Sequence, residues 1–341
     1  MNSGKVEGIV DLFRRHWGKL PDEVEALPAS GSARLYYRLL SGPHSYIGVY
    51  NLNVAENKLF IDFSRHFRQK GLHVPEIYAV ADDVQTYLQE DLGKEMLLDA
   101  VGRERKDNYL SPSSMHFYRK ALDELLRFQI LGHEGCHYAD CLPRPVFDRT
   151  CMLWDLNYFK YCFLRLAGAE FSEDRLETDF IDLIDRLAAV RTDSFMFRDF
   201  QSRNIMIREG EVWLIDYQGG RQGALSYDVA SLLYDAIVEI PDNQREELLA
   251  YYIQQLKLYR PVDEDTFRND YYHFVLIRLL QALGAFGLRG LYERKQHFLD
   301  SIQPGLRQVD ALFDSGRLGE KYPEIRRVIT SLRHRPEEEK G

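Results

Sequence analysis

Residues 195–228, FMFRDFQSRNIMIREGEVWLIDYQGGRQGALSYD, decide the fold. Asp199 is followed five residues later by Asn204, which leads directly into an apolar run. The chain turns at Glu209-Gly210 and returns as a second apolar run that ends at Asp216. Two such runs around a glycine-containing turn predict a β-hairpin. Because a hairpin brings its two ends together, we expect Asn204 and Asp216 to lie side by side, with Asp199 close by.

These three side chains suit phosphoryl transfer. An amide oxygen and a carboxylate, from Asn204 and Asp216, are the hard ligands that Mg²⁺ prefers. The carboxylate of Asp199 can then accept the proton of an attacking hydroxyl. The alternative is that Asp and Asn only cap and turn the chain, as they often do around hairpins. The joint pattern, with Arg198 before the first Asp and the apolar strand 213–215 before the last, favours phosphoryl transfer.

Outward from this stretch, the pattern of the chain changes once, near Gly93. Before it, four strand-like runs at 34–40, 45–51, 76–82 and 86–92 surround a helical segment at 55–69. After it, helical spacing dominates, with helices expected at 113–129, 264–288 and 291–313. We therefore predict an α+β, bilobal fold, with a small β-rich N-terminal lobe at 1–93 and a larger helical C-terminal lobe at 94–341. A cleft between two lobes is where small ligands usually bind.

Composition narrows the classes of function. The chain has 341 residues with 44 Lys and Arg against 53 Asp and Glu, a net charge of −9. An acidic chain is a poor general binder of nucleic acid, which needs clustered basic side chains. The first 19 residues have the pattern of an amphipathic helix rather than a signal peptide. No uncharged apolar run reaches about 18 residues, the length of a membrane span. Four cysteines in a chain of this length suit a reducing compartment. We expect a cytoplasmic protein without a membrane partner; the sequence does not indicate an oligomeric state.

The segments FRDFQSRNIMI, WLIDYQGG and LSYDVASLLYD resemble the aminoglycoside phosphotransferase and choline kinase superfamily, which has the protein-kinase-like fold. Further similar segments run along nearly the whole chain: SGSARLYYRL, HFRQKGLHVPEIYAV, YLQEDLG and LIRLLQALGAFGL. Within the superfamily, the sequence is most similar to bacterial anomeric kinases of N-acetylmuramate and N-acetylglucosamine. That narrower similarity is the weaker of the two.

The resemblance implies a role for several residues. Asp199 matches the catalytic base, and Asn204 and Asp216 match the Mg²⁺ ligands. Asp228 matches an acid that braces the catalytic loop from the start of the next helix, expected at 228–238, and we assign Arg198 to the same bracing.

The resemblance also implies where ATP binds. The backbone carbonyl of Glu90 and the N–H of Leu92 match the hinge that pairs with adenine. The alternative is that this sequence is only the end of a strand followed by a glycine. Ser30, Gly31 and Ser32 match the loop that cradles the phosphates, although a plain hairpin turn would also fit.

Three departures from the family pattern stand out. The histidine usual before Arg198 is Phe197, the phosphate loop has a single glycine, and the run 45–51 carries no lysine for the phosphates. We expect Arg34 to substitute for that lysine and Glu56 to pair with a cation in the cleft; the alternative is that Arg34 is a surface arginine.

The sequence therefore predicts an ATP- and Mg²⁺-dependent phosphotransferase with a small-molecule hydroxyl acceptor, most plausibly an amino sugar phosphorylated at its anomeric hydroxyl. Arg203 and Gln218, next to the metal residues in the sequence, are candidates to meet an N-acetyl or carboxylate group of that acceptor. The alternatives are a kinase of an aminoglycoside or choline-like amine, and a nucleotide-binding pseudokinase without turnover.

Overall fold

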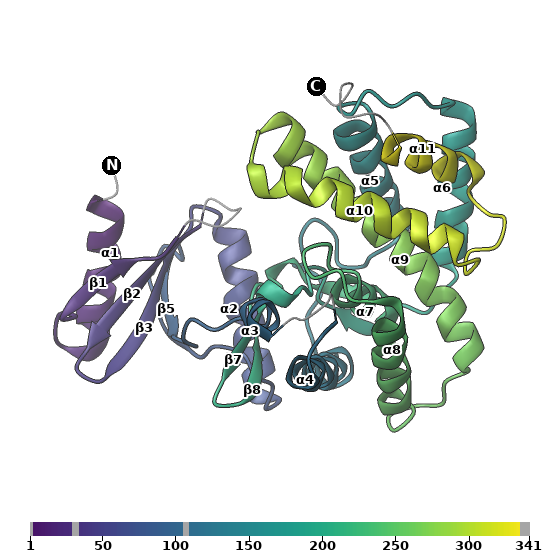
Figure 1. Cartoon of the computed structure of the whole chain (residues 1–341). Coiled ribbons are helices and arrows are strands. Elements are labelled where there is room, and N and C mark those ends of the chain that lie inside the picture. Colours follow the sequence, from purple (N-terminus) through teal and green to yellow (C-terminus); the bar gives the residue numbers. More distant parts are fainter. Residues whose placement is uncertain (1–2, 29–33, 105–108, 335–341) are drawn as a thin grey trace.

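The computed structural model describes residues 3–28, 34–104 and 109–334. A β-sheet forms the N-terminal part and a helical assembly forms the remainder, as Figure 1 shows from purple to yellow. The expected α+β, bilobal fold is confirmed. The division at Gly93 remains a prediction.

One antiparallel sheet builds the N-terminal part. Its strand order is β1-β2-β3-β5-β4, from β1 (Glu23–Ala26), β2 (Leu35–Ser41), β3 (His44–Tyr50), β4 (Ile77–Val80) and β5 (Thr86–Glu90). All four expected strands are present. β1 was not expected, because it is only four residues long and its residues are almost all exposed.

A helix covers each face of this sheet. α1 (Ser3–Trp17) packs Ile9 and Phe13 against Leu39 and Leu88 in a small separate core. α2 (Val54–Gln69), which begins at the side-chain cap of Asn53, turns its phenylalanines toward the opposite face and the helical part. The amphipathic helix expected at the start of the chain and the helix expected at 55–69 are both confirmed.

Nine helices make up the rest of the structure in the described residues. They are α3 (Leu97–Glu104), α4 (Pro112–Ile130), α5 (Arg149–Phe159), α6 (Glu173–Ala188), α7 (Leu225–Leu233), α8 (Asp242–Leu256), α9 (Glu264–Phe286), α10 (Gln296–Asp314) and α11 (Pro323–Arg333). The helices expected at 113–129 and 264–288 are confirmed. The helix expected to begin at Leu291 begins five residues later, because residues 287–292 continue α9 as a π-helical turn.

The central helix of this part is α9, which packs against α5, α7 and α10. Residues 264–292 are the one stretch of the described chain that is long and apolar enough to cross a membrane, and 61% of its most apolar window is buried inside the protein. Its apolar character therefore serves the core of the helical part.

The stretch quoted at the outset forms two small antiparallel pairs. β6 (Ser194–Met196) pairs with β9 (Arg221–Gly223), and β7 (Ile205–Arg208) forms the expected hairpin with β8 (Glu211–Leu214). Glu209 and Gly210 both have positive φ, at 54° and 77°, as a tight hairpin turn requires.

The hairpin lies between the sheet and the helices (Figure 1) and is tied to the sheet side. The N–H of Ile207 donates to the carbonyl of Glu95, and the N–H of Leu214 donates to the carbonyl of His73. These bonds hold the hairpin next to the segment that precedes β4 and the segment that follows β5.

Candidate active site

The carboxylate of Asp228 holds the loop between β6 and the hairpin through hydrogen bonds. It accepts the N–H of Phe197 at 2.6 Å and the N–H of Arg198 at 2.9 Å. Complete burial raises the pKa of Asp228 to about 7, against the opposing effect of these two bonds. The residue lies in the first turn of α7 and not at a helix cap, because the helix begins at Leu225, three residues before the expected start.

Arg198 braces the same loop from a strained backbone conformation. Its φ is +83°, in the left-handed region that costs a non-glycine residue about 1–3 kcal/mol. Its guanidinium forms a two-point ion pair with Asp155, at 2.7 and 2.5 Å, and lies over the rings of Phe147 and Tyr227. These contacts fix the residue immediately before Asp199.

Phe197 fills the core position where the superfamily usually has a histidine. Its ring is fully buried and packs edge-on against Phe200, near Tyr217. The loop is thus supported by packing at this position and by hydrogen bonds at Asp228.

Asn204, one of the two predicted metal ligands, contacts both the loop that carries Asp199 and the other predicted ligand, Asp216. Its side-chain amide donates to the carbonyl of Asp199 at 2.8 Å and lies 3.5 Å from Oδ2 of Asp216. The N–H of Ile215 in turn donates to the carbonyl of Asn204. The three residues predicted to meet at this end of the hairpin do so.

The oxygen atoms at this point suit a hard cation. Asp216 has φ +68°, and its carboxylate accepts a hydrogen bond from Gln218 at 2.7 Å. Burial raises the pKa of Asp216, and the nearby carboxylate of Asp199 adds to the rise. A cation beside Asp216 would relieve that cost, and the amide donation by Asn204 leaves its side-chain oxygen as a second ligand. The described residues contain no cluster of three or more His, Cys, Asp or Glu arranged for a metal, so protein ligands alone would not complete the shell.

Arg34 is a buried cleft residue and not a surface arginine. It is 3% exposed and forms ion pairs with Glu56 at 3.1 Å and with Asp216 at 3.7 Å. Burial, which lowers the pKa of an arginine, is outweighed by Tyr36, Tyr87 and Glu56, so the pKa of Arg34 lies above its ordinary value. A permanent positive charge therefore stands between the first turn of α2 and the carboxylate of Asp216.

The hinge predicted at 89–93 is stiffened by side chains. Arg38 pairs with Asp91 at 2.5 and 3.0 Å and donates to the carbonyl of Gly93. Glu90 is the last residue of β5, and its carboxylate pairs with Arg208 of the hairpin. Leu92 is buried. The roles of Glu90 and Leu92 toward adenine remain predictions, as do those of Ser30, Gly31 and Ser32, which lie outside the described residues.

Asp199 also lines a pocket that does not include Asp216, and we call it the Asp199 pocket. Its lining includes Asp199, Arg203, Ser231, Asp235, Arg278, Gln281, Phe286, His297, Phe298 and Ser301. It contains Arg203, as the sequence suggested for an acceptor site. Gln218 is not among its lining residues and instead contacts Asp216.

Sequence reasoning missed the contribution of α9 and α10 to this pocket. Arg278 of α9 is 5% exposed, and its guanidinium Nη2 lies 3.8 Å from Oδ1 of Asp199. The available signal was that Arg278 and Gln281, three residues apart, interrupt an otherwise apolar helix on one face.

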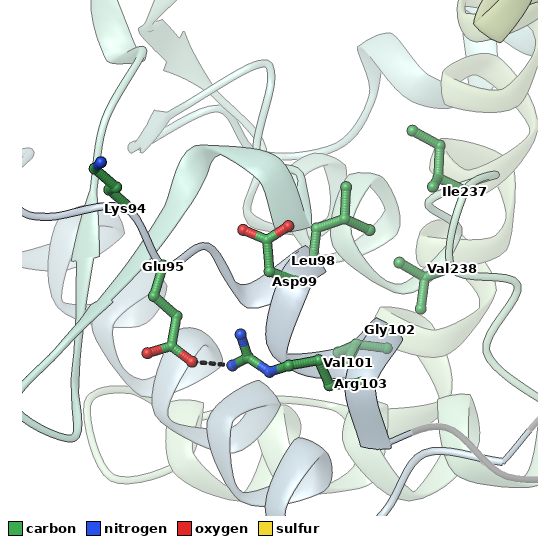
Figure 2. A pocket seen from close by; sticks show the side chains of 9 residues that line it. All are labelled: Lys94, Glu95, Leu98, Asp99, Val101, Gly102, Arg103, Ile237 and Val238. Atoms are coloured by element: carbon green, nitrogen blue, oxygen red, sulfur yellow. Dashed lines mark hydrogen bonds and ion pairs between the residues drawn. The ribbon is translucent and has the colours of Figure 1, made fainter. Parts of the chain in front are cut away.

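A second, open groove lies beside the first, between α3 and residues 237–238. Ile237 lines both. Figure 2 shows that Glu95 of this groove is paired to Arg103. Asp99 accepts the N–H of Met96 at the start of α3. The groove therefore offers mainly apolar surface next to the Asp199 pocket.

Comparison with known proteins agrees with this arrangement. A profile of the phosphotransferase enzyme family matches residues 24–264, well over half of the chain. The chain belongs to the phosphotransferase enzyme family. The match begins in β1 and ends at the start of α9, so it includes the sheet, the loop that carries Asp199 and the hairpin.

Two bacterial kinases are similar in sequence to this phosphotransferase. The N-acetylmuramate/N-acetylglucosamine kinase of Pseudomonas aeruginosa is 29% identical over 232 residues, covering 66% of this chain and 64% of that protein. The kinase of the same name from Pseudomonas putida is 26% identical over 255 residues, covering 73% and 71%. The match thus spans less than two thirds of the length of the first relative.

Solved structures share the fold of this phosphotransferase. The amicoumacin kinase hAmiN, in complex with AMP-PNP, Ca²⁺ and Ami, aligns with a TM-score of 0.64 at 13% identity, over 95% of this chain and 97% of that one. A choline kinase from Cryptosporidium parvum aligns with a TM-score of 0.62 at 12% identity, over 95% and 99%. At such low identity these likenesses establish the fold alone.

Proposed function

We propose that this phosphotransferase transfers the γ-phosphoryl group of ATP to a hydroxyl group of an amino sugar. The observation that carries the proposal is the meeting of Asp199, Asn204 and Asp216 at one end of the hairpin, with the cation of Arg34 beside them. A base, two hard oxygen ligands and a positive charge are the parts that phosphoryl transfer requires.

In the proposed reaction, Asp199 accepts the proton of the acceptor hydroxyl. The hydroxyl oxygen forms the new bond to the γ-phosphorus, the bond from that phosphorus to its bridging oxygen breaks, and ADP leaves. Asp199 suits this role because its side chain is 52% exposed and faces the Asp199 pocket, whereas Asp216 contacts Arg34 and Gln218. Most of the rate enhancement then comes from positioning and electrostatics.

Asn204 and Asp216 would hold Mg²⁺, whose chemistry is to neutralise charge on the phosphates. Arg34, with Glu56 behind it, would hold the phosphates in place of the missing strand lysine. The single-glycine loop with Ser30, Gly31 and Ser32, and the hinge backbone at Glu90 and Leu92, would contact the phosphates and adenine.

The names of the two Pseudomonas relatives support an amino sugar as the acceptor. The anomeric hydroxyl of such a sugar is more acidic than an ordinary alcohol, so a weak base such as a carboxylate suffices. We place the enzyme in the cytoplasm, where ATP is available, and assign it neither a nucleic-acid nor a membrane partner.

The test is turnover of the full chain with MgATP and a panel of N-acetylglucosamine, N-acetylmuramate, choline and an aminoglycoside, with products identified by ³¹P spectroscopy. We expect a phosphorylated sugar whose formation stops when the metal is chelated. Phosphorylation of an amine alone would replace the sugar kinase by an amine kinase. MgATP binding without any product would indicate a pseudokinase.

Asp199→Asn tests the base, because it keeps the size of the side chain and removes its basicity. We expect kcat to fall ~10²-fold or more while the Kd for MgATP, measured by calorimetry, stays nearly unchanged. Asp193→Asn is the control, since Asp193 pairs with Arg260 outside the pocket. Normal turnover by Asp199→Asn would remove the base from the mechanism.

A further inference from the structure

The charged residues that line the Asp199 pocket differ in how fully their charges are paired with other groups of the protein. Among its lining residues in the described chain, the carboxylates are Asp199 and Asp235. Asp235 accepts hydrogen bonds from the N–H and hydroxyl of Ser202 and from the N–H of Ile237, and so serves the loop. With Asp199 assigned as the base, the pocket has no carboxylate left to bind a cationic acceptor.

The cation of Arg278, in contrast, is held by neutral groups. Its Nε donates to the hydroxyl of Ser231 at 2.9 Å, and its Nη1 donates to the side-chain oxygen of Gln281 at 2.6 Å. Among the described residues, the carboxylate that pairs with Arg278 is Asp199, at 3.8 Å, which is beyond hydrogen-bond distance. Arg198 differs, because Asp155 neutralises it directly at two points.

The ion pair with Asp199 is longer than a hydrogen bond, so it neutralises the buried guanidinium of Arg278 only in part. Burying a charge without a close counter-charge is costly, and binding a carboxylate recovers part of that cost through a charge-assisted hydrogen bond. A guanidinium carries further N–H donors beyond the two used here. Arg278, at the wall of the pocket, can therefore bind a negatively charged group.

The remaining walls suit a sugar ring next to this charge. Phe286 of α9 and Phe298 of α10 line the pocket, with ring centroids 6.3 Å apart. Ser301 and His297 add polar groups from the first turns of α10. Aromatic faces pack against the apolar side of a sugar, while the polar groups meet its hydroxyls.

We propose that Arg278 is a specificity-determining residue, whose guanidinium binds a carboxylate carried by the acceptor sugar close to the hydroxyl that reacts. The inference rests on the proposed function and goes beyond it, because it names one side chain that makes the enzyme favour an acidic N-acetylated sugar over its neutral counterpart. The same cation disfavours a positively charged acceptor at this position.

Two variants remove this charge in different ways. Arg278→Gln deletes the cation. Gln281→Glu leaves Arg278 in place and gives it a carboxylate partner at the half-buried position that it already contacts, so it neutralises the charge with less risk to folding. Arg278→Lys keeps a positive charge, and Arg289→Gln, which breaks an ion pair with Glu293 outside the pocket, is the matched control.

The readout compares N-acetylmuramate with N-acetylglucosamine, which differ by one carboxylate-bearing substituent. For Arg278→Gln and Gln281→Glu we expect the ratio of kcat/KM, acid over neutral, to fall ~10–100-fold, mainly through the KM for the acid. Arg278→Lys should recover part of the ratio, and Arg289→Gln should leave it unchanged. An equal loss with both sugars would overturn the proposal, since Arg278 would then serve the base or the phosphate and not the acceptor.

Calorimetry separates this inference from the proposed function. Binding of each sugar to Asp199→Asn, with and without Gln281→Glu, measures the preference without turnover. If the wild-type chain phosphorylates neither sugar, the proposed function fails, and loss of acid binding on Gln281→Glu would still support the role of Arg278. If both sugars are phosphorylated and Gln281→Glu leaves their relative binding unchanged, the role of Arg278 fails and the kinase stands. Thermal unfolding confirms that each variant is folded.

Discussion

At the scale of single residues, charge placement distinguishes the two sides of Asp199. On one side Arg34 faces Glu56 and Asp216, and on the other Arg278 faces Ser231 and Gln281. Each guanidinium is buried, but only Arg34 has a carboxylate within 3.1 Å. The close ion pair holds Arg34 in one position, whereas Arg278, without such a close pair, fits the proposed role of binding a charged ligand.

Arg34→Ala tests the side that we assign to the nucleotide. Because β3 carries no lysine, we propose that Arg34 holds the phosphates, and the KM for ATP should then rise ~10-fold or more in Arg34→Ala while the KM for the acceptor changes little. Arg34→Lys should restore part of the affinity. Steady-state kinetics measures both constants, with Arg14→Ala, an exposed arginine paired with Asp11, as the control. An unchanged KM for ATP would exclude Arg34 from the nucleotide site.

At the scale of elements, Gly284 in α9 and Gly287, just past its end, allow close packing against α5 and the segment after it. A Cβ built on Gly287 would lie 1.9 Å from the carbonyl oxygen of Cys162, and one on Gly284 would lie 2.8 Å from the ring of Tyr158. The backbone of α9 therefore touches the segment after α5 directly. Arg278 and Gln281, on the same helix, line the pocket wall.

Gly287→Ala should separate these two segments. We expect a loss of about 1–3 kcal/mol in the free energy of unfolding, since the clash is with backbone that cannot move aside cheaply, together with a raised KM for the acceptor. Gly8→Ala is the opposite control: Gly8 lies in α1 with open space around it, so alanine should stabilise the protein by up to about 1 kcal/mol. Chemical denaturation measures both. Equal stability of Gly287→Ala and wild type would contradict the close approach.

At the scale of the whole molecule, one hydrophobic core crosses from the sheet to the helices. The inner face of the sheet contributes Val49 and Tyr87, α2 contributes Phe60, and Phe60 stacks on Tyr217 beyond the hairpin with centroids 4.8 Å apart. The hydroxyl of Tyr217 also hydrogen-bonds to Ser64 of α2. The two parts therefore share packing and not only a linker.

We expect the two parts to unfold together. Trp17 reports on the small core under α1, and Trp213 reports on the hairpin, where it stacks on His73. In variants that keep one of these tryptophans, the fluorescence midpoints should coincide with each other and with the loss of helical circular dichroism. A Trp17 transition at a clearly lower denaturant concentration would instead show that the sheet unfolds independently.

The sequence by itself determined the features that depend on neighbours along the chain. The Glu209-Gly210 turn and the apolar runs on either side specify the hairpin, and the hairpin alone brings Asn204 to Asp216. The four strands and the helices at 113–129 and 264–288 follow from the period of their apolar residues. Such patterns survive in any tertiary context, because a strand or an amphipathic helix must bury one face.

Tertiary structure alone decided which distant side chains meet. The sequence indicated a cation partner for Glu56 and selected Arg34 for the role of the missing lysine, but it indicated no partner for the other arginines. Arg38 pairs with Asp91 and Arg198 pairs with Asp155, in each case across several intervening elements. The burial of Arg34 beside Asp216 and of Arg278 beside Asp199 likewise depends on how the sheet and the helices pack. A side chain's neighbours across the core are set by how helices and sheet pack, and the free energy of a buried charge depends on those neighbours more than on its own position in the chain.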